Sequence, residues 1–229
     1  MNTDNSKFKI QNSKLGSHKL PIYLFSKTSH PDVNFIPVLA TEFFQPDVDF
    51  SRYDAIVLTS KQAVTALDKI SGAWTHIPAL TIADLTAAMA RKSGATVMEK
   101  GDGYGDSLAE IIINGYPDKR WLYPRPEVVA SDFGDKVRHA GVDLDDVVVY
   151  KTSCNAEAGE IELEDNAVLI FTSPFTIDCF LHFYEFKPGH KVVAIGKTTN
   201  GALPKSVKAV MPETPSVENC VSLAKQLAD

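Results

Sequence analysis

Residues 55–60 (AIVLTS) recur 113 positions later as residues 168–173 (VLIFTS). Each copy leads, after the same interval, to a second threonine, at Thr86 in the first copy and at Thr199 in the second. A repeat that keeps its register over about half a domain's length indicates two copies of one α/β unit. The sequence therefore predicts two similar lobes with a cleft between them.

Length and charge agree with a protein of two lobes. The chain has 229 residues, which is more than one typical domain and supports two lobes of about 100 residues, each with its own core. Its net charge is −6 at pH 7, and the first 20 residues carry four of the lysines and only one of the acidic residues. Because the rest of the chain is more acidic still, nucleic acid is not expected as a partner.

The cysteine pattern and the polar start of the chain exclude several classes of protein. Cys154, Cys179 and Cys220 are odd in number, widely spaced and without a CxxC motif, which argues against a disulfide framework or a zinc ribbon and suits a reducing cytosol. The histidines form no HxxxH motif, so no metal is indicated. Residues 1–19 lack a signal-peptide core and are expected to be a disordered leader. No stretch approaches the length of a membrane span, and we expect a cytoplasmic protein.

Short apolar runs alternate with helical patterns from residue 20 onward. Strands are predicted near 20–25, 35–40, 54–58, 78–82, 95–98, 120–123, 145–150, 168–171, 191–195 and 208–211. Helices are predicted near 60–70, 84–93, 105–114, 127–140, 174–184, 198–203 and 216–228. This alternation predicts parallel sheets that helices cover on both faces.

Two of these strands lie outside the repeated block. Residues 35–41 (FIPVLAT) and 146–152 (DVVVYKT) flank the first copy and are interpreted as an antiparallel pair that links the lobes. The inserted lobe then spans residues 42–145, and the other lobe joins residues 20–34 to residues 153–229. A linker of two strands permits opening and closing.

A pair of hydroxyl residues ends one strand of each copy, directly before a helix. Thr59 and Ser60 in the first copy, and Thr172 and Ser173 in the second, occupy positions where hydroxyls cap the first helical turn and free N–H groups point outward. Ligands of open α/β sheets bind at such strand ends. The four residues are therefore candidates for binding a ligand, and each is also explained as an ordinary helix cap.

The second threonines, Thr86 and Thr199, lie at another pair of strand-to-helix turns, four residues after Ile82 and Ile195. Four helix N-termini at one cleft would attract carboxylates through their N–H groups and dipoles, by about 0.3–1 kcal/mol per helix end at the surface. An acidic protein can thereby bind a polyanion without a cluster of basic residues.

The same residues resemble the motifs of the uroporphyrinogen-III synthase family, and the resemblance spans about residues 20–229. The matching segments are residues 59–64 (TSKQAV) for the TSxxAV element, 82–86 and 195–199 for the paired IGxxT elements, 148–150 (VVY) for the vVY strand, 171–174 (FTSP), and 36–39 (IPVL) for the linker. Each motif is short, and their order and spacing carry the resemblance.

This resemblance implies two Rossmann-like (flavodoxin-like) parallel-sheet lobes, one of them discontinuous, joined by a two-stranded antiparallel linker. It implies a lyase of porphyrin and heme biosynthesis that uses no cofactor and cyclises hydroxymethylbilane, a linear tetrapyrrole polycarboxylate, in the cleft between the lobes. Loss of the terminal hydroxyl gives an azafulvene on ring A, ring D attacks through its substituted carbon, and a spiro intermediate rearranges so that ring D closes inverted. The products are uroporphyrinogen III and water.

The resemblance also assigns roles to residues. Tyr150 matches the tyrosine of the vVY strand, and a phenol is a neutral donor at pH 7 that would assist the departure of the hydroxyl. A tyrosine packed at the linker is the alternative. Thr86 and Thr199 match substrate-binding threonines of the family. Candidates that would meet the substrate's carboxylate arms are Lys61, Arg125, Lys197 and Thr198, each of which is also explained as an ordinary surface residue.

Several positions depart from the family pattern. Ala83 replaces a usual glycine, so its turn must avoid a conformation that only glycine adopts. Ala130 stands where relatives often place a basic residue, which leaves Arg125 as a substitute, and Pro126 occupies another usual glycine position. The first helix, between residues 24 and 35, is expected to be nearly deleted.

Two other functions remain open from the residues alone. One is a bilobal module that binds or senses a small anion without catalysis. The other is a sugar-nucleotide transferase, although the chain is short for that architecture and lacks a nucleotide motif. A monomer is expected, and a transient contact with the upstream hydroxymethylbilane synthase is left open.

Overall fold

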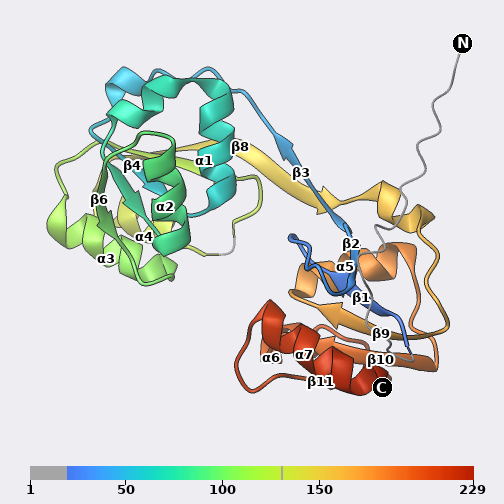
Figure 1. The fold of residues 1–229 in the computed structure, drawn as a ribbon. Coiled ribbons are helices and arrows are strands. Elements are labelled where there is room, and N and C mark those ends of the chain that lie inside the picture. The colour runs from blue at the N-terminus through green and yellow to red at the C-terminus, as the bar shows by residue number, and fades with distance from the viewer. Residues whose placement is uncertain (1–19, 130) are drawn as a thin grey trace, which may run out of the picture. The chain divides into compact units, whose positions relative to one another are not determined.

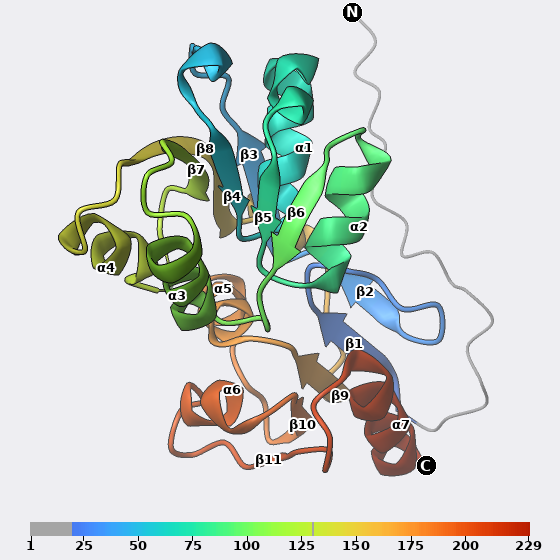
Figure 2. The ribbon, with the colours of Figure 1, turned by 90° about the vertical axis from the view of Figure 1, so that its left-hand side faces the viewer.

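The computed structural model describes residues 20–129 and 131–229, so the expected leader at residues 1–19 and the departure at Ala130 lie outside the described residues. Contacts between Cα atoms divide the chain into two units. Unit 1 combines the residues up to Ala40 with Ser153–Asp229, and unit 2 is Thr41–Thr152. Each unit contains its own sheet and helices (Figures 1 and 2).

Unit 2 is built on a six-stranded sheet in the order β3-β8-β7-β4-β5-β6. Its strands are β3 (Leu39–Phe43), β4 (Ala55–Leu58), β5 (Ala79–Thr81), β6 (Val97–Lys100), β7 (Trp121–Pro126) and β8 (Leu144–Cys154). The pairs β7·β8, β4·β7, β4·β5 and β5·β6 are parallel. Numbered along the chain from β4 to β8, these five strands have the order 3-2-1-4-5, which is the Rossmann order 3-2-1-4-5-6 without its last strand.

Helices cover both faces of the unit 2 sheet because its strands carry apolar residues on both sides. The helices are α1 (Lys61–Ile70), α2 (Asp84–Lys92), α3 (Gly105–Gly115) and α4 (Phe133–His139). Figure 2 shows α1 and α2 on one face and α3 and α4 on the other. Ile56 and Leu58 of β4 pack in the core under α1, and Ala55 and Val57 pack in the core under α3 and α4. The alternation of side chains along β4 therefore supplies both cores.

Unit 1 is built on a five-stranded parallel sheet in the order β11-β10-β9-β1-β2. Its strands are β1 (Ile22–Phe25), β2 (Asn34–Ile36), β9 (Asn166–Phe171), β10 (Gly189–Ala194) and β11 (Ala209–Val210). Numbered along the chain, the strands have the order 2-1-3-4-5, which is that of flavodoxin. No helix lies between β1 and β2 in the described residues, so the expected deletion of the first helix is confirmed.

The helices of unit 1 are α5 (Pro174–Phe183), α6 (Lys197–Gly201) and α7 (Val217–Ala228). Phe25 and Phe171 pack with α5 on one face of the sheet, and Leu24 and Ile170 pack with α7 on the other. The fold prediction, parallel sheets covered on both faces, is confirmed in both units. No helix in the described residues is long and apolar enough to cross a membrane.

The internal repeat is visible as matched elements. In each copy the order is strand, helix, strand, helix, strand, helix, and α1 and α2 begin 113 residues before α5 and α6. The strand beside β4 is β7, which comes later in the chain, whereas the strand beside β9 is β1, which comes earlier. The two units are thus related by a circular permutation of one strand order.

Two predicted elements are wrong in detail. The strand expected near 35–40 is two strands, because Pro37 has no N–H to continue the ladder of β2. The helix expected over 127–140 begins only at Phe133, because β7 extends through Pro126 and a turn follows it. Three short 3-10 helices were not predicted: η1 (Phe50–Arg52), η2 (Gly72–His76) and η3 (Ala156–Glu160).

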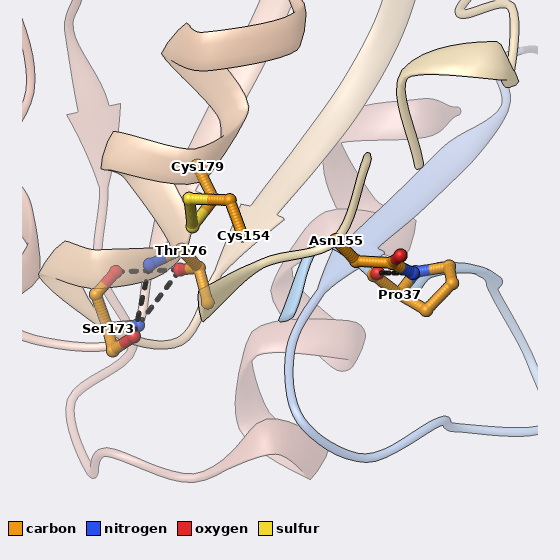
Figure 3. The surroundings of a disulfide bond; sticks show 6 residues. All are labelled: Pro37, Cys154, Asn155, Ser173, Thr176 and Cys179. Atoms are coloured by element: carbon orange, nitrogen blue, oxygen red, sulfur yellow. Dashed lines mark hydrogen bonds between the residues drawn. A yellow bond between two sulfur atoms is a disulfide. The ribbon is translucent and has the colours of Figure 1, made fainter. Parts of the chain in front are cut away.

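The cysteine pattern argued against a disulfide framework, but the structure pairs two of the three cysteines. Cys154, the last residue of β8, forms a disulfide with Cys179 of α5 (Figure 3). The sequence separation of 25 residues gave no framework pattern, but β8 ends beside α5 and brings the two sulfur atoms together. Cys220 is free and buried, and its burial raises the pKa of the thiol to about 11.

Candidate active site

The turn after β4 begins the candidate site of unit 2. Ser60 is the N-cap of α1, and its Oγ accepts a hydrogen bond from the Ala63 N–H at 3.1 Å. Thr59, one residue earlier, is hydrogen-bonded to the side chain of Tyr123 on β7. The prediction that Ser60 caps a helix is confirmed, because its extended backbone lets the side chain fold back over the first turn.

Tyr150 lies on β8, and its side chain reaches the same turn. Its Oη is 2.8 Å from the Oγ of Ser60, and only 5% of the residue is exposed. Burial raises the pKa of Tyr150, while the hydrogen bond with Ser60 acts in the opposite direction. The phenol is therefore protonated at neutral pH and remains available as a proton donor.

The strand pairing explains how Tyr150 reaches Ser60 from a strand that is not adjacent to β4. β7 lies between them, but it pairs with β4 only at Trp121 and Leu122, whereas it pairs with β8 as far as Pro126. The β4·β7 boundary is also the point where the strand order reverses. Open α/β sheets bind ligands outside the strand ends at this switch point.

The equivalent turn of unit 1 lies at the corresponding switch point, between β9 and β1. Thr172 donates its hydroxyl to the carbonyl oxygen of Phe25 at the end of β1, at 3.2 Å. Ser173 caps α5 and forms a capping box with Thr176, and Pro174 occupies the first helical position as predicted. The hydroxyl of Thr172 thus ties two strands together, and the first turn of α5 is rigidly capped.

The second pair of turns is alike in the two units. Thr86 and Thr199 are each the third residue of their helices, α2 and α6, and both are buried. The caps before these helices are Ala83, with φ −163°, and Gly196, with φ −173°. Both are extended conformations that any residue adopts, which explains why alanine is tolerated where relatives have glycine.

The side chains predicted to bind carboxylate arms differ in whether they are exposed or already bonded within the protein. Lys61 and Lys197 are exposed first residues of α1 and α6, and Thr198 is exposed beside Lys197. Arg125 is instead engaged, because its guanidinium pairs with Asp146 and donates to the carbonyl oxygens of Pro126 and Glu127. Its charge is already neutralised within unit 2.

Within unit 2 the structure brings together Thr59, Ser60 and Tyr150, and it adds a residue that the sequence analysis missed. Tyr123 bonds Thr59, and burial raises the pKa of its phenol, with a contribution from the neighbouring Tyr150. A tyrosine at the end of a predicted strand beside Arg125 was the available signal. Among the described residues, no group of histidine, cysteine and acidic side chains is placed to hold a metal ion.

Comparisons with known proteins agree with this architecture. The model of the family described as uroporphyrinogen-III synthase HemD matches residues 31–222. The structure of uroporphyrinogen-III synthetase from Helicobacter pylori 26695 is similar with a TM-score of 0.78 and 22% sequence identity, over 91% of this chain and 99% of that chain. A mutant uroporphyrinogen III synthase from Thermus thermophilus is similar with a TM-score of 0.52 and 16% identity, over 86% of this chain and 88% of that chain.

A search of curated protein sequences gives no significant match. At these identities the solved structures establish the fold, and the family model, which covers most of the chain, establishes the relationship. The chain belongs to the uroporphyrinogen-III synthase family.

Proposed function

We propose that the protein cyclises hydroxymethylbilane to uroporphyrinogen III, with inversion of ring D and release of water, and that Tyr150 is the proton donor of this reaction. Family membership supports the reaction. The observation that supports the role of Tyr150 is its protonated, buried phenol at the switch point of unit 2, bonded to the cap of α1.

The reaction consumes a proton at the start and releases one at the end. The Tyr150 O–H gives its proton to the terminal hydroxyl of the substrate, the C–O bond breaks, and water leaves from ring A. The pyrrole rings lose a proton as they regain aromaticity during ring closure, and that proton returns to the phenolate. Substrate and product then differ by one water molecule, and the enzyme is unchanged.

Selectivity depends on holding the chain ends in one pose, because the free substrate also closes without inversion of ring D. The turns after β4, β5, β9 and β10 each present main-chain N–H groups beside Thr59 and Ser60, Thr86, Thr172 and Ser173, and Thr199. We propose that these amides bind the carboxylate arms. Fixing the arms favours one geometry of ring closure over the other through orientation.

Side chains supplement the amides in this proposal. Lys61, Lys197 and Thr198 are exposed at helix starts and would meet carboxylate arms directly. Arg125 would bind an arm only by exchanging Asp146 for it, so we expect it to contribute less.

We further propose that the enzyme acts as a cytoplasmic monomer without a cofactor, with at most a transient contact with the upstream hydroxymethylbilane synthase. The biosynthetic role of the family supports this location. Disulfides are rare in cytosolic proteins, so the Cys154–Cys179 bond is an observation that does not favour this location.

An isomer assay tests the function. The purified protein is incubated with enzymatically generated hydroxymethylbilane, and the uroporphyrinogen isomers are separated after oxidation. We expect mostly the type III isomer, formed faster than the type I isomer forms without protein. A type I product at the spontaneous rate would show that the protein does not cyclise this substrate.

A further inference from the structure

Ser60 caps a helix and also contacts the proposed donor, and the contact with Tyr150 is not needed for capping. The Oγ of Ser60 has one hydrogen to donate and two lone pairs to accept with. One lone pair accepts the N–H of Ala63 at 3.1 Å, which completes the cap. The 2.8 Å contact with Tyr150 joins two residues 90 positions apart and uses the remaining capacity of the hydroxyl.

The internal repeat supplies a comparison for this contact. Ser173 occupies the same position in unit 1 and caps α5 in the same way, by accepting the N–H of Thr176 at 3.2 Å. There the side chain of Thr176 completes a capping box, whereas its counterpart Ala63 has no hydroxyl. Capping alone therefore does not require a tyrosine partner, and only the serine of unit 2 has one among the hydrogen bonds of the described residues.

We propose that Ser60 is a positioning residue for Tyr150, donating its hydroxyl hydrogen to the phenol oxygen so that the proton of Tyr150 is directed to the substrate. This inference rests on the proposed role of Tyr150 as proton donor. The direction of the bond follows from the chemistry, because a phenol oxygen that has given up its proton can only accept. The Ser60 hydroxyl lies 2.8 Å from this oxygen and can donate a hydrogen bond to it.

Ser60 also offsets an effect of burial. The apolar surroundings that keep Tyr150 protonated make its phenolate costly, which weakens the phenol as an acid. A hydrogen bond to the phenolate, at the N-terminus of the ten-residue helix α1, stabilises the charge that develops as the proton leaves. The bond thus strengthens in the transition state, where it lowers the barrier.

The test compares variants of Ser60 in the full chain. Ser60→Ala and Ser60→Gly remove the hydroxyl, and glycine retains most of the capping ability of serine. Ser60→Thr retains both the hydroxyl and the cap. We expect kcat for type III product to fall by about 10–100-fold in the first two variants, with KM little changed, and to recover in Ser60→Thr.

Two controls separate positioning from stability. Ser216→Ala removes the N-cap of α7, whose Oγ accepts the Asn219 N–H at the same distance of 3.1 Å but contacts no tyrosine, and it is expected to leave kcat unchanged. The pKa of Tyr150, followed by NMR of ring-labelled tyrosine, is expected to rise in Ser60→Gly because a donor to the phenolate is lost. Equal kcat values in Ser60→Gly and Ser60→Thr, or an unchanged pKa of Tyr150, would overturn the inference.

A double variant distinguishes the failure of this inference from that of the proposed donor. If Ser60 acts through Tyr150, adding Ser60→Gly to Tyr150→Phe reduces kcat no further. A Tyr150→Phe variant with normal kcat would instead refute the donor itself. A slow Tyr150→Phe variant that Ser60→Gly slows again by the full factor would refute only the role of Ser60.

Discussion

Two tyrosine hydroxyls, one from β7 and one from β8, reach the turn after β4, and each is bonded to a residue of that turn. Tyr150 is bonded to Ser60 and Tyr123 to Thr59. Burial raises the pKa of both phenols, so their protonation alone does not distinguish a donor from a packed side chain. Tyr150 is distinguished from Tyr123 by the family motif, which includes Tyr150. The rates of the corresponding phenylalanine variants provide the test.

We predict that Tyr150→Phe lowers kcat by about 10²–10⁴-fold, because a positioned general acid contributes that much, while KM changes little. Tyr123→Phe is the matched control, since it removes a phenol from the adjacent strand and is expected to slow turnover much less. Initial rates of type III formation measure both. If Tyr123→Phe lost as much activity as Tyr150→Phe, the assignment of the proton donor to Tyr150 would be contradicted.

At this scale the sequence indicated candidate site residues but not what their side chains contact. Ser60 and Tyr150 were both candidates, yet their hydrogen bond spans 90 residues and depends on β7 parting from β4 beyond Leu122. Arg125 was a candidate because of its place after a strand, but its partner Asp146 lies on another strand. Such pairings follow from register, which the residue pattern alone does not determine.

Individual elements show where local pattern was sufficient. Strands with fully buried runs, such as β4 and β9, were predicted within one or two residues because both faces are apolar. The helix expected over 127–140 failed because Val128 and Val129 fitted a helical pattern although both are exposed in the turn after β7. Apolar residues outside a core carry no periodic signal.

The disulfide between β8 and α5 can be tested by counting the thiols that react with an alkylating reagent. Under denaturing, non-reducing conditions we expect one thiol to react with an alkylating reagent, that of Cys220, and three after reduction. Reduction should lower the free energy of unfolding by about 2–4 kcal/mol, because the bond closes a loop in the unfolded chain. Peptide mapping identifies the pair, and Cys220→Ala should leave no reactive thiol. Three reactive thiols without reduction would mean that the bond does not form.

The C-terminal end of α5 is joined to η3 by the hydroxyl of Tyr184, which donates to the carbonyl oxygens of Ala158 and Ile161. Burial, followed by the nearby Tyr23, raises the pKa of Tyr184 to about 12. The folded protein therefore holds this proton more tightly than the unfolded chain, in which the pKa is about 10. The resulting stability is complete below pH 10 and is lost as the pH rises from there to about 12.

We predict that Tyr184→Phe lowers the free energy of unfolding at pH 7 by about 1 kcal/mol and weakens its decline between pH 10 and 12. Urea unfolding at a series of pH values measures both effects. Tyr104→Phe is the control, because Tyr104 is 73% exposed and its removal should change neither quantity. An alkaline decline of the same size in Tyr184→Phe would show that other groups cause it.

At the scale of the whole molecule, the repeat in the sequence captured three strands and three helices of each unit but not how each sheet is completed. Unit 2 takes its last two strands, β7 and β8, from the chain that follows the repeat, whereas unit 1 takes β1 and β2 from the chain that precedes it. The repeat therefore indicated the fold class, while the permuted strand order came from pairings between distant segments.

Because unit 1 contains both segments of its sheet, it should fold without the inserted unit. The N–H of Asn155 donates to the carbonyl oxygen of Val38 at 2.8 Å, and its side chain donates to that of Pro37, so the two points where the chain leaves and re-enters unit 1 lie together (Figure 3).

We predict that replacing residues 41–152 by a short glycine-serine linker gives a domain that unfolds cooperatively, since loop closure over such a gap costs little. Circular dichroism during urea unfolding, with near-ultraviolet signals from the packed Phe25 and Phe171 rings, measures this. In the same shortened chain, Asn155→Ala should lower the unfolding midpoint. A gradual transition that this variant leaves unchanged would mean that unit 1 depends on the inserted residues for its core.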